Sequence, residues 1–382
     1  MGAKKRVCVR CVIDESVPET TFDADGVCSW CHRMSARPKV VAPTPEARAK
    51  ELDRVVDELK AAGRGRRYDC IIGLSGGADS SYAALVAHDR GLRPLVVHVD
   101  NGWNTELAVQ NIERIVRGLK LDLVTEVIDW EEFRGLQLSL LRAGVVDLEL
   151  VSDHAIGAGI LANARWRGIR HVVTGDNVAT EATLPKGWNH PKYDLRNIKA
   201  INRKYERATT KTFPKLSTFG LMFHFHVLRI RYIGLLSYVD YVKENAMDEL
   251  ERRLGWRRYA KKHFESIITR FYQGYILPVK FGIDKRQFHY ALLINSGQMT
   301  RAEALADLEK PPYDPKLAEE DKVYVCKKFG ISIAEFERMM REPPHSHYEY
   351  PSDQPLFELA LRANRGLRRV IHSFGGGTSR GS

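Results

Sequence analysis

The chain has 382 residues, of which 44% are hydrophobic, so it is long enough for a sizeable buried core and one or two smaller units. Its 59 lysines and arginines outnumber its 48 aspartates and glutamates, and the net charge of +11 favours an anionic ligand without choosing between nucleic acid, nucleotide and sugar nucleotide. A basic segment rather than an apolar one precedes the first cysteines, and the most apolar long window, 221–242, carries charged residues. We therefore expect a cytoplasmic protein without a membrane span.

Four of the six cysteines form two C-x2-C pairs, which are Cys8 with Cys11 and Cys28 with Cys31. Each pair makes a tight knuckle with two thiolates, and two knuckles complete a tetrahedron around one ion. The sequence therefore predicts a structural zinc site in an N-terminal unit, 1–40, in which His32 is a neighbour rather than a ligand. An iron–sulfur cluster is the alternative that the spacing leaves open. A disulfide framework is not expected in a large chain without a secretion signal.

A linker with three prolines precedes a helical pattern around 52–59, after which strand-like and helical patterns alternate. The predicted strands are 68–74, 94–99, 122–128 and 171–174. The predicted helices follow the first strand as far as residue 88, follow the second over 108–119, and end near 141 and 167. This alternation predicts an α/β domain, 45–215, with a parallel sheet and crossover helices. Ligands bind beyond the carboxyl ends of the strands in sheets of this kind.

Three segments follow predicted strands and are expected to meet at that edge, namely 75–80, 100–104 and 174–177. The first of them, SGGADS, lies between a strand and a helix. Its two glycines let backbone N–H groups wrap a phosphate, and the following helix adds its positive end. The carboxylate of Asp79 fits beside a phosphate when Mg²⁺ or loop amides mediate the contact. A glycine turn between a strand and a helix is also common for purely structural reasons.

The string Ser-Gly-Gly-x-Asp-Ser in this context resembles the PP-loop of the ATP pyrophosphatases, which lacks the Gly-Lys-Thr of a Walker loop. The resemblance implies a HUP-like nucleotide domain whose loop holds the β- and γ-phosphates of ATP. Enzymes of this class attack the α-phosphate, release pyrophosphate and leave AMP on an oxygen, and a nitrogen or sulfur nucleophile then displaces the AMP. The ATP-binding residues implied here are Leu74, Ser75, Gly76, Gly77, Asp79 and Ser80.

Further segments narrow the resemblance to one family. They are HVDNGWN at 98–104, SDHAI at 152–156, TGDN at 174–177, the long segment 271–305 and KPPYD at 310–314. Together with the paired cysteines they resemble the N-acetyl sugar amidotransferases, PP-loop enzymes of surface-polysaccharide (lipopolysaccharide, O-antigen) biosynthesis, over about residues 8–314. One departure is Asp176, where similar proteins often carry glutamate. The carboxylate is retained, so we expect its role to be retained as well.

This resemblance implies the synthesis of an amidine. ATP would adenylate the acetamido oxygen of a nucleotide-linked sugar, and ammonia would then displace AMP to give an acetamidino group. Because the chain has no evident glutaminase Cys-His pair, the resemblance also implies two partners, a separate glutaminase and an ammonia-channelling barrel. The implied cofactors are ATP, Mg²⁺ and a structural Zn²⁺, and no nucleic acid is expected to bind.

The resemblance suggests roles for residues outside the loop as well. Asp100 is a candidate to contact the adenosine or a magnesium shell, or to cap its own loop. Gly175 allows a close approach to AMP, and Asp176 is a candidate to bind magnesium or to orient ammonia. His154 either touches the nucleotide or caps a helix.

Two groups of cations follow further along the chain. Lys280, Lys285 and Arg286 are candidates to grip the departing pyrophosphate or the sugar diphosphate, with a solvated surface as the alternative. A second basic stretch, 196–215, is a candidate substrate lid or docking face.

From about residue 216 the sequence turns aromatic and helical, which predicts a mainly helical C-terminal domain, 216–374, with the aromatic side chains in its core. The last residues, 375–382, predict a flexible tail. The strongest alternative function is a PP-loop enzyme that modifies tRNA, by thiolation or amine ligation through an adenylated base. Such enzymes also combine zinc knuckles, ATP and a basic surface.

Overall fold

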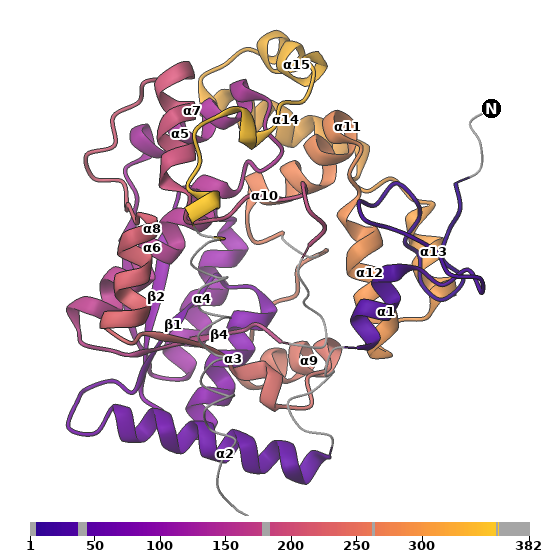
Figure 1. The fold of residues 1–382 in the computed structure, drawn as a ribbon. Coiled ribbons are helices and arrows are strands. Elements are labelled where there is room, and N and C mark those ends of the chain that lie inside the picture. The colour runs from indigo at the N-terminus through magenta and orange to yellow at the C-terminus, as the bar shows by residue number, and fades with distance from the viewer. Residues whose placement is uncertain (1–4, 37–43, 178–183, 262–263, 357, 359–382) are drawn as a thin grey trace, which may run out of the picture.

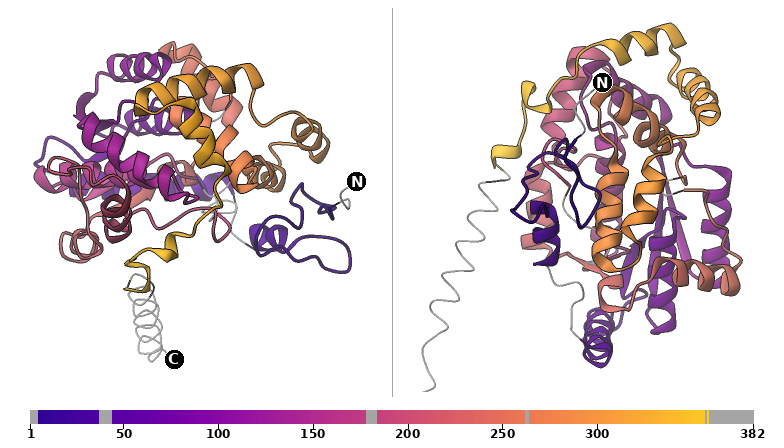
Figure 2. Two further views of the ribbon diagram at one scale, coloured as in Figure 1. Left: turned by 90° about the horizontal axis from the view of Figure 1, so that it is seen from above. Right: turned by 90° about the vertical axis from the view of Figure 1, so that its right-hand side faces the viewer.

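The computed structural model describes residues 5–36, 44–177, 184–261, 264–356 and 358. Five parallel strands form one sheet with helices on both faces, and a helical region and a small N-terminal unit lie beside it (Figures 1 and 2). The strands are β1 (Cys70–Gly73), β2 (Pro94–Asp100), β3 (Asp122–Val127), β4 (His171–Thr174) and β5 (Arg231–Gly234). The helices of the sheet region are α2 (Pro45–Ala62), α3 (Ala78–Asp89), α4 (Glu106–Gly118), α5 (Trp130–Ala143), α6 (Leu150–Trp166), α7 (Leu195–Tyr205), α8 (Thr218–Met222), the π-helix η1 (Phe223–Val227), the 3-10 helix η2 (Leu235–Tyr238) and α9 (Lys243–Leu254).

The strand order is β3-β2-β1-β4-β5, and all neighbouring strands are parallel. From β1 the chain runs outward through β2 and β3, and it then returns to place β4 on the other side of β1. The strand order therefore reverses between β1 and β4, and in open sheets ligands bind at the carboxyl ends of the strands at such a point. The predicted α/β fold with a parallel sheet and crossover helices is confirmed.

The strand β5 corrects one prediction, because this segment was expected to belong to a helical domain. It pairs with β4, so the sheet continues past the predicted boundary at residues 215 and 216. The strand has two exposed and two half-buried residues and lies between a π-helix and a 3-10 helix, so it lacks the buried apolar run that marks β1 and β4. The helix α9, which follows, packs against α3 and also belongs to the sheet region.

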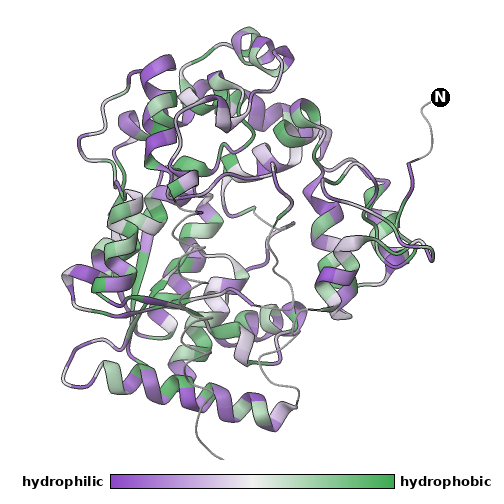
Figure 3. Cartoon of the chain, in the orientation of Figure 1, coloured by the Kyte–Doolittle hydropathy of each residue, from purple (hydrophilic) through white to green (hydrophobic). Residues whose placement is uncertain are grey.

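Side chains on the two faces of the sheet enter two different hydrophobic clusters. Ile71 and Val97 pack with residues of α5 and α6, whereas Ile72 and Val96 pack with residues of α2, α3 and α4. Both faces are therefore buried, as expected for a parallel sheet. Hydrophobic and hydrophilic residues alternate along α2 (Figure 3), and its four buried residues belong to the second cluster.

The C-terminal region is helical, as predicted. Its helices are α10 (Ile267–Phe271), the π-helix η3 (Tyr272–Ile276), α11 (Leu277–Phe281), α12 (Lys285–Ser296), α13 (Arg301–Leu308), α14 (Pro315–Phe329), α15 (Ile333–Arg341) and the 3-10 helix η4 (His347–Glu349). The helix α1 (Ser29–Ser35) of the N-terminal unit contacts α12. Among the described residues, no helix has both the length and the apolar character needed to cross a membrane. The predicted tail, 375–382, lies outside the described residues.

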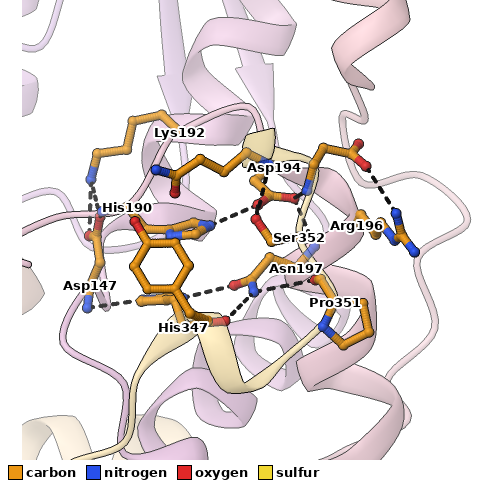
Figure 4. A network of polar contacts seen from close by, with 12 residues as sticks. Asp147, His190, Lys192, Asp194, Arg196, Asn197, His347, Pro351 and Ser352 are labelled. Atoms are coloured by element: carbon orange, nitrogen blue, oxygen red, sulfur yellow. Dashed lines mark hydrogen bonds and ion pairs between the residues drawn. The ribbon is translucent and has the colours of Figure 1, made fainter. Parts of the chain in front are cut away.

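A buried polar network fastens the last described segment to the sheet region (Figure 4). Asp194 caps α7 and accepts a hydrogen bond from Ser352 Oγ at 2.5 Å. Asn197 Nδ2 donates to the backbone oxygen of His347 at 2.9 Å. The rings of His190 and His347 stack with their centroids 4.4 Å apart. These contacts hold the segment after α15 against the start of α7.

Candidate functional site

The glycine loop lies at the carboxyl end of β1, as the sequence predicted. Leu74 continues the strand, because its N–H donates to Val97 O at 2.9 Å, and its side chain is buried. Gly76 has a φ of 81°, and a Cβ at this position would lie 2.7 Å from Ala108 O. The backbone angle and the lack of space both require glycine here. Gly77 is the N-cap of α3.

Two serines close the loop on itself. The Oγ atoms of Ser75 and Ser80 lie 3.2 Å apart, and Ser75 Oγ also accepts from Gly77 N at 3.3 Å. Within the part of the chain that the structure describes, no side chain caps α3. The backbone N–H groups of a first helical turn and the positive end of the helix dipole make this turn a place for an anion such as a phosphate.

The carboxylate of Asp79 is tied to a tyrosine from another part of the chain. Tyr241 Oη donates to Asp79 Oδ1, and the Tyr241 side chain is buried. This contact fixes Asp79 in the first turn of α3, where the helix dipole stabilises a negative charge.

The end of β4 closes against the start of α3. A Cβ on Gly175 would lie 2.6 Å from the carbonyl carbon of Asp79 and 2.9 Å from the nitrogen of Ser80, so only glycine permits this approach. Two of the three segments predicted to converge therefore meet. Asp176 is exposed beside the contact and accepts a hydrogen bond from Thr174 Oγ1 at 2.8 Å. A solvent-facing carboxylate in this place fits a Mg²⁺ ligand.

The third segment, after β2, is ordered by its own side chains. Asp100 Oδ1 accepts from Gly102 N at 2.9 Å and from Asn104 Nδ2 at 3.1 Å. The same Asn104 amide contacts His98 Nε2 at 3.1 Å, and His98 Nδ1 lies 2.9 Å from Leu74 O. Since an amide NH₂ only donates, Nε2 of His98 accepts and Nδ1 carries the proton. Asp100 thus caps its own loop, and the network links that loop to the end of β1.

Two aromatic side chains at the loop were assigned by the sequence analysis to the core of a helical domain. Trp256 Nε1 and Tyr259 Oη both donate to Gly76 O at 3.0 Å. They hold the loop carbonyl from outside the sheet. The aromatic pattern of the sequence predicted that these side chains are buried, but it did not predict their contact with the glycine loop.

Lys328, on α14, is a further residue that sequence reasoning missed. Its Nζ lies 4.7 Å from the ring centroid of Trp103 and 4.6 Å from that of Trp130, and it donates to Gly102 O. Burial lowers the pKa of Lys328, and the charge of Asp100 opposes this effect. The side chain therefore joins the C-terminal region to the loop after β2. No motif in the sequence marks it.

The structure corrects the prediction for His154. This residue lies inside α6 and is fully buried. Its Nδ1 contacts Lys192 O at 3.0 Å, and its Nε2 accepts from Leu216 N at 3.1 Å. Because both ring nitrogens are used by the backbone, His154 neither caps the helix nor reaches a nucleotide. Burial lowers its pKa to about 4, so the ring is neutral at pH 7.

The three predicted cations of the C-terminal region have structural partners. Lys280 donates to backbone carbonyls at the end of α15, Arg286 pairs with Asp284 at 2.7 Å, and Lys285 lies 3.5 Å from Glu149. Within the residues that the structure describes, no contact joins these cations to the glycine loop. Their grip on a diphosphate stays a prediction.

One acidic side chain holds the end of the basic stretch 196–215. Glu132, in α5, accepts from the backbone nitrogens of Lys211, Thr212 and Phe213 at 2.6 to 2.9 Å. Burial raises the pKa of Glu132. The hydrogen bonds lower this pKa by more than burial raises it, so the net shift is downward. The contacts fix this part of the stretch in place and argue against a lid here.

The four N-terminal cysteines meet as predicted. Their sulfur atoms all lie within 4.8 Å of one another, and all four side chains are fully buried. Backbone N–H groups point at the sulfurs, for example Cys11 N at 3.4 Å from Cys8 Sγ. Arg301 Nε donates to Cys11 O at 2.9 Å and so braces one knuckle from α13. Four buried thiols around one point suit a closed tetrahedral zinc site. His32 pairs with Asp23 at 2.7 Å and is not a ligand.

Comparisons with known proteins give a family match for the C-terminal region of the chain. Residues 265–364 match the family model described as "LPS biosynthesis protein WbpG-like, C-terminal domain". This match confirms, for that part of the chain, the predicted resemblance to a family of surface-polysaccharide biosynthesis. No curated protein gives a match.

Two solved structures are similar at a low level. NMN synthetase from Francisella tularensis is 14% identical, with 76% of this chain and 98% of that chain covered and a TM-score of 0.36. NH3-dependent NAD synthetase from Campylobacter jejuni, in complex with the nitrate ion, is 13% identical, with 75% and 97% covered and a TM-score of 0.29. Because both TM-scores are low, the assignment of the fold rests on the strand order and the glycine loop themselves.

Proposed function

We propose that this protein is an ATP-dependent, AMP-forming amidotransferase that converts an acetamido group of a nucleotide-linked sugar into an acetamidino group. The observation that carries the proposal is the glycine loop where the strand order reverses, closed by Gly175 against the first turn of α3. The match of residues 265–364 to a domain of lipopolysaccharide biosynthesis supports a sugar as the acceptor.

The chemistry requires an activated oxygen, because an amide is a poor electrophile at neutral pH. The acetamido oxygen attacks the α-phosphorus of ATP, and the bond to pyrophosphate breaks. Ammonia then attacks the acetamido carbon, the carbon–oxygen bond breaks, and AMP leaves with the former amide oxygen. The product is an amidinium group, which keeps its positive charge at neutral pH.

The residues of the site have distinct roles in this proposal. The loop N–H groups and the hydroxyls of Ser75 and Ser80 bind the β- and γ-phosphates and stabilise the charge of the departing pyrophosphate. The exposed carboxylate of Asp176 would hold Mg²⁺, which would neutralise phosphate charge. The loop that Asp100 orders borders the nucleotide. Donors of this kind accelerate the reaction only if they are held in place before it, which the contacts of Gly76 and Gly175 provide.

Ammonia supply completes the proposal. Ammonium rather than ammonia dominates at neutral pH, so we include a separate glutaminase and an ammonia-channelling barrel as partners, and a cytoplasmic location where ATP is available.

The test is product formation without the partners. The protein is incubated with ATP, Mg²⁺ and ammonium salts at raised pH together with a panel of nucleotide sugars that carry acetamido groups. We expect AMP and a sugar in which one oxygen is replaced by NH, identified by mass spectrometry. Adenylation of tRNA in place of a sugar would favour the alternative, a tRNA-modifying enzyme. Absence of an amidine with every sugar, under conditions where ATP is cleaved, would refute the acceptor class.

A further inference from the structure

The amino ends of three strands, at the opposite end of the sheet from the glycine loop, carry arginines from three segments of the chain. The first segment precedes β1, the second runs from the last turn of α6 towards β4, and the third ends in the first residue of β5. The residues, called here the arginine strip, are Arg64, Arg66, Arg67, Arg165, Arg167, Arg170, Arg229 and Arg231, and all eight are exposed. None of the three segments contains lysine.

Contacts between the loops make the strip continuous. Arg66 Nη1 donates to Gly168 O, which joins the first loop to the second. Arg231 N donates to Arg170 O at 2.9 Å, and His171 pairs with Arg231 across the sheet, which joins the second loop to the third. The three segments that carry the eight exposed arginines are therefore neighbours, in the order set by β1, β4 and β5.

Most of this positive charge has no carboxylate partner. Arg67 pairs with Asp122 at 2.8 Å, and Arg231 pairs with Glu58 at 3.1 Å. No ion pair within the described part of the chain involves the other six arginines. Such a surface has a strongly positive potential and attracts an anionic partner.

Exposed apolar side chains lie among the arginines. Trp166 is 88% exposed, Val227 is 64% exposed and Phe223 is 40% exposed. Arg165 reaches over the ring of Phe223, with 5.8 Å between the guanidinium carbon and the ring centroid, and Trp166 follows Arg165 in the chain. An indole that is almost fully exposed gains little from the folded protein alone.

We propose that the arginine strip and these three apolar side chains form a binding surface for a membrane that contains anionic phospholipids. Guanidinium groups bind phosphate oxygens in pairs, and indole and phenyl rings favour the headgroup region. Nucleic acid would also meet the charge, but Val227 offers no face on which a base stacks. The surface lies at the amino ends of the strands, and the glycine loop lies at their carboxyl ends. A bound membrane therefore leaves the glycine loop accessible.

The test is flotation of the full chain with vesicles of phosphatidylcholine alone or with phosphatidylglycerol added. We expect binding only to the anionic vesicles and a loss of binding at high salt. Replacing Arg165, Arg170 and Arg229 together by glutamine should weaken binding about 100-fold, since each basic residue near an anionic surface contributes a factor of about five. Trp166→Ser should weaken binding without changing the salt dependence, because it removes apolar area that the membrane would bury and removes no charge.

The matched control replaces three exposed arginines of α7 and α15, namely Arg203, Arg338 and Arg341, by glutamine. This variant loses the same charge and should bind the anionic vesicles nearly as well as the parent. Equal losses in both triple variants would show that only net charge matters, and the proposal would fail. It would also fail if the parent bound RNA but not the anionic vesicles. Circular dichroism of each variant shows whether the fold is kept.

Discussion

Gly175 shows how one position without a side chain organises the site. The end of β4 lies so close to the backbone of Asp79 and Ser80 that a single methyl group would overlap with it. Gly76 is constrained in the same way by Ala108 and in addition by its positive φ. Both glycines permit contacts between backbone segments, and those contacts set the shape of the loop.

The first prediction concerns Gly175→Ala. The added methyl group should displace the first turn of α3 and reduce ATP cleavage by about 100-fold, because small misplacements of binding groups cost that much in catalysis. Overpacking should also lower the free energy of unfolding by about 1–3 kcal/mol. Steady-state release of pyrophosphate measures the first effect, and urea unfolding measures the second.

Gly159→Ala is the control for this prediction. A Cβ there would meet Val99 Cγ2 at 3.4 Å, an ordinary contact, and the position lies inside α6. This variant should keep its activity. Equal activity of both variants would show that the approach of β4 to α3 does not shape the site.

At the level of single residues, the sequence predicts positions whose chemistry is local. The serines and glycines of the loop are recognised by their spacing in the sequence, and so are the four cysteines. The structure brings the members of each group together. Trp256, Tyr259 and Lys328 reach the site from segments far along the chain. Their roles depend on tertiary contacts, which a pattern of neighbouring residues does not encode.

Among the elements, the segment after α9 acts as a strap over the loop. Trp256 and Tyr259 share the carbonyl of Gly76 as acceptor. Each hydrogen bond of this kind contributes about 0.5–1.5 kcal/mol, so losing one loosens the loop without unfolding it.

The second prediction follows from this strap. Tyr259→Phe removes one donor and little volume, so it should raise the KM for ATP by up to about tenfold and leave the unfolding free energy within about 1.5 kcal/mol of the parent. Tyr205→Phe removes the hydroxyl that lies 2.8 Å from Tyr350 Oη, away from the loop, and serves as the control. If the two variants showed the same KM, the strap would have no part in binding ATP.

The third prediction concerns the link between α5 and the segment 209–213. Glu132→Gln should lower the free energy of unfolding by about 2–3 kcal/mol at pH 7, because hydrogen bonds to a charged group are replaced by weaker ones. Hydrogen bonds hold the folded-state pKa of Glu132 below its ordinary value of 4.5. Its contribution is therefore complete above pH 4.5 and is lost as the pH falls through the folded-state pKa.

Urea unfolding of both proteins across this pH range measures the effect. The difference between parent and variant should shrink as the pH falls below about 4.5. A difference that stayed constant with pH would mean that the charge of Glu132 does not stabilise the segment.

The sequence predicts the regular alternation of strands and helices well, and it misses the strand that follows this alternation. Strands β1 to β4 and helices α3 to α6 lie close to their predicted ranges, because buried apolar strand runs alternate there with helical segments. Strand β5 lacks the buried apolar run of β1 and β4, and its position is decided by pairing with β4, which local patterns do not contain. His154 shows the same limit, since its burial depends on segments near 192 and 216 that pack against α6.

At the scale of the whole molecule, the cysteine unit is joined to the C-terminal region. Trp30 packs edge-on against Phe288 with ring centroids 5.0 Å apart, and Arg301 donates to carbonyls of the first knuckle. Asn295 donates to Cys31 Sγ at 3.6 Å. A metal in the four-cysteine site therefore stabilises more than its own short segment.

The fourth prediction tests this coupling. The purified protein should contain one zinc ion per chain, measured by elemental analysis, and Cys11→Ser should abolish this. Removal of the metal should also lower the temperature of unfolding and expose the Trp30–Phe288 contact to proteolysis, because metal binding and folding are coupled. Cys326→Ser, at a buried cysteine outside the unit, is the control and should keep the zinc. Iron and inorganic sulfide in place of zinc would contradict the assignment.

The account as a whole depends on how the glycine loop holds ATP. The most direct measurement follows ATP labelled at the α-phosphate, in the presence of Mg²⁺, ammonium and an acetamido nucleotide sugar, and separates AMP from ADP. We predict AMP and pyrophosphate in equal amounts, both requiring the sugar and both formed about 100-fold more slowly by Gly175→Ala. Formation of ADP and phosphate instead would contradict the account.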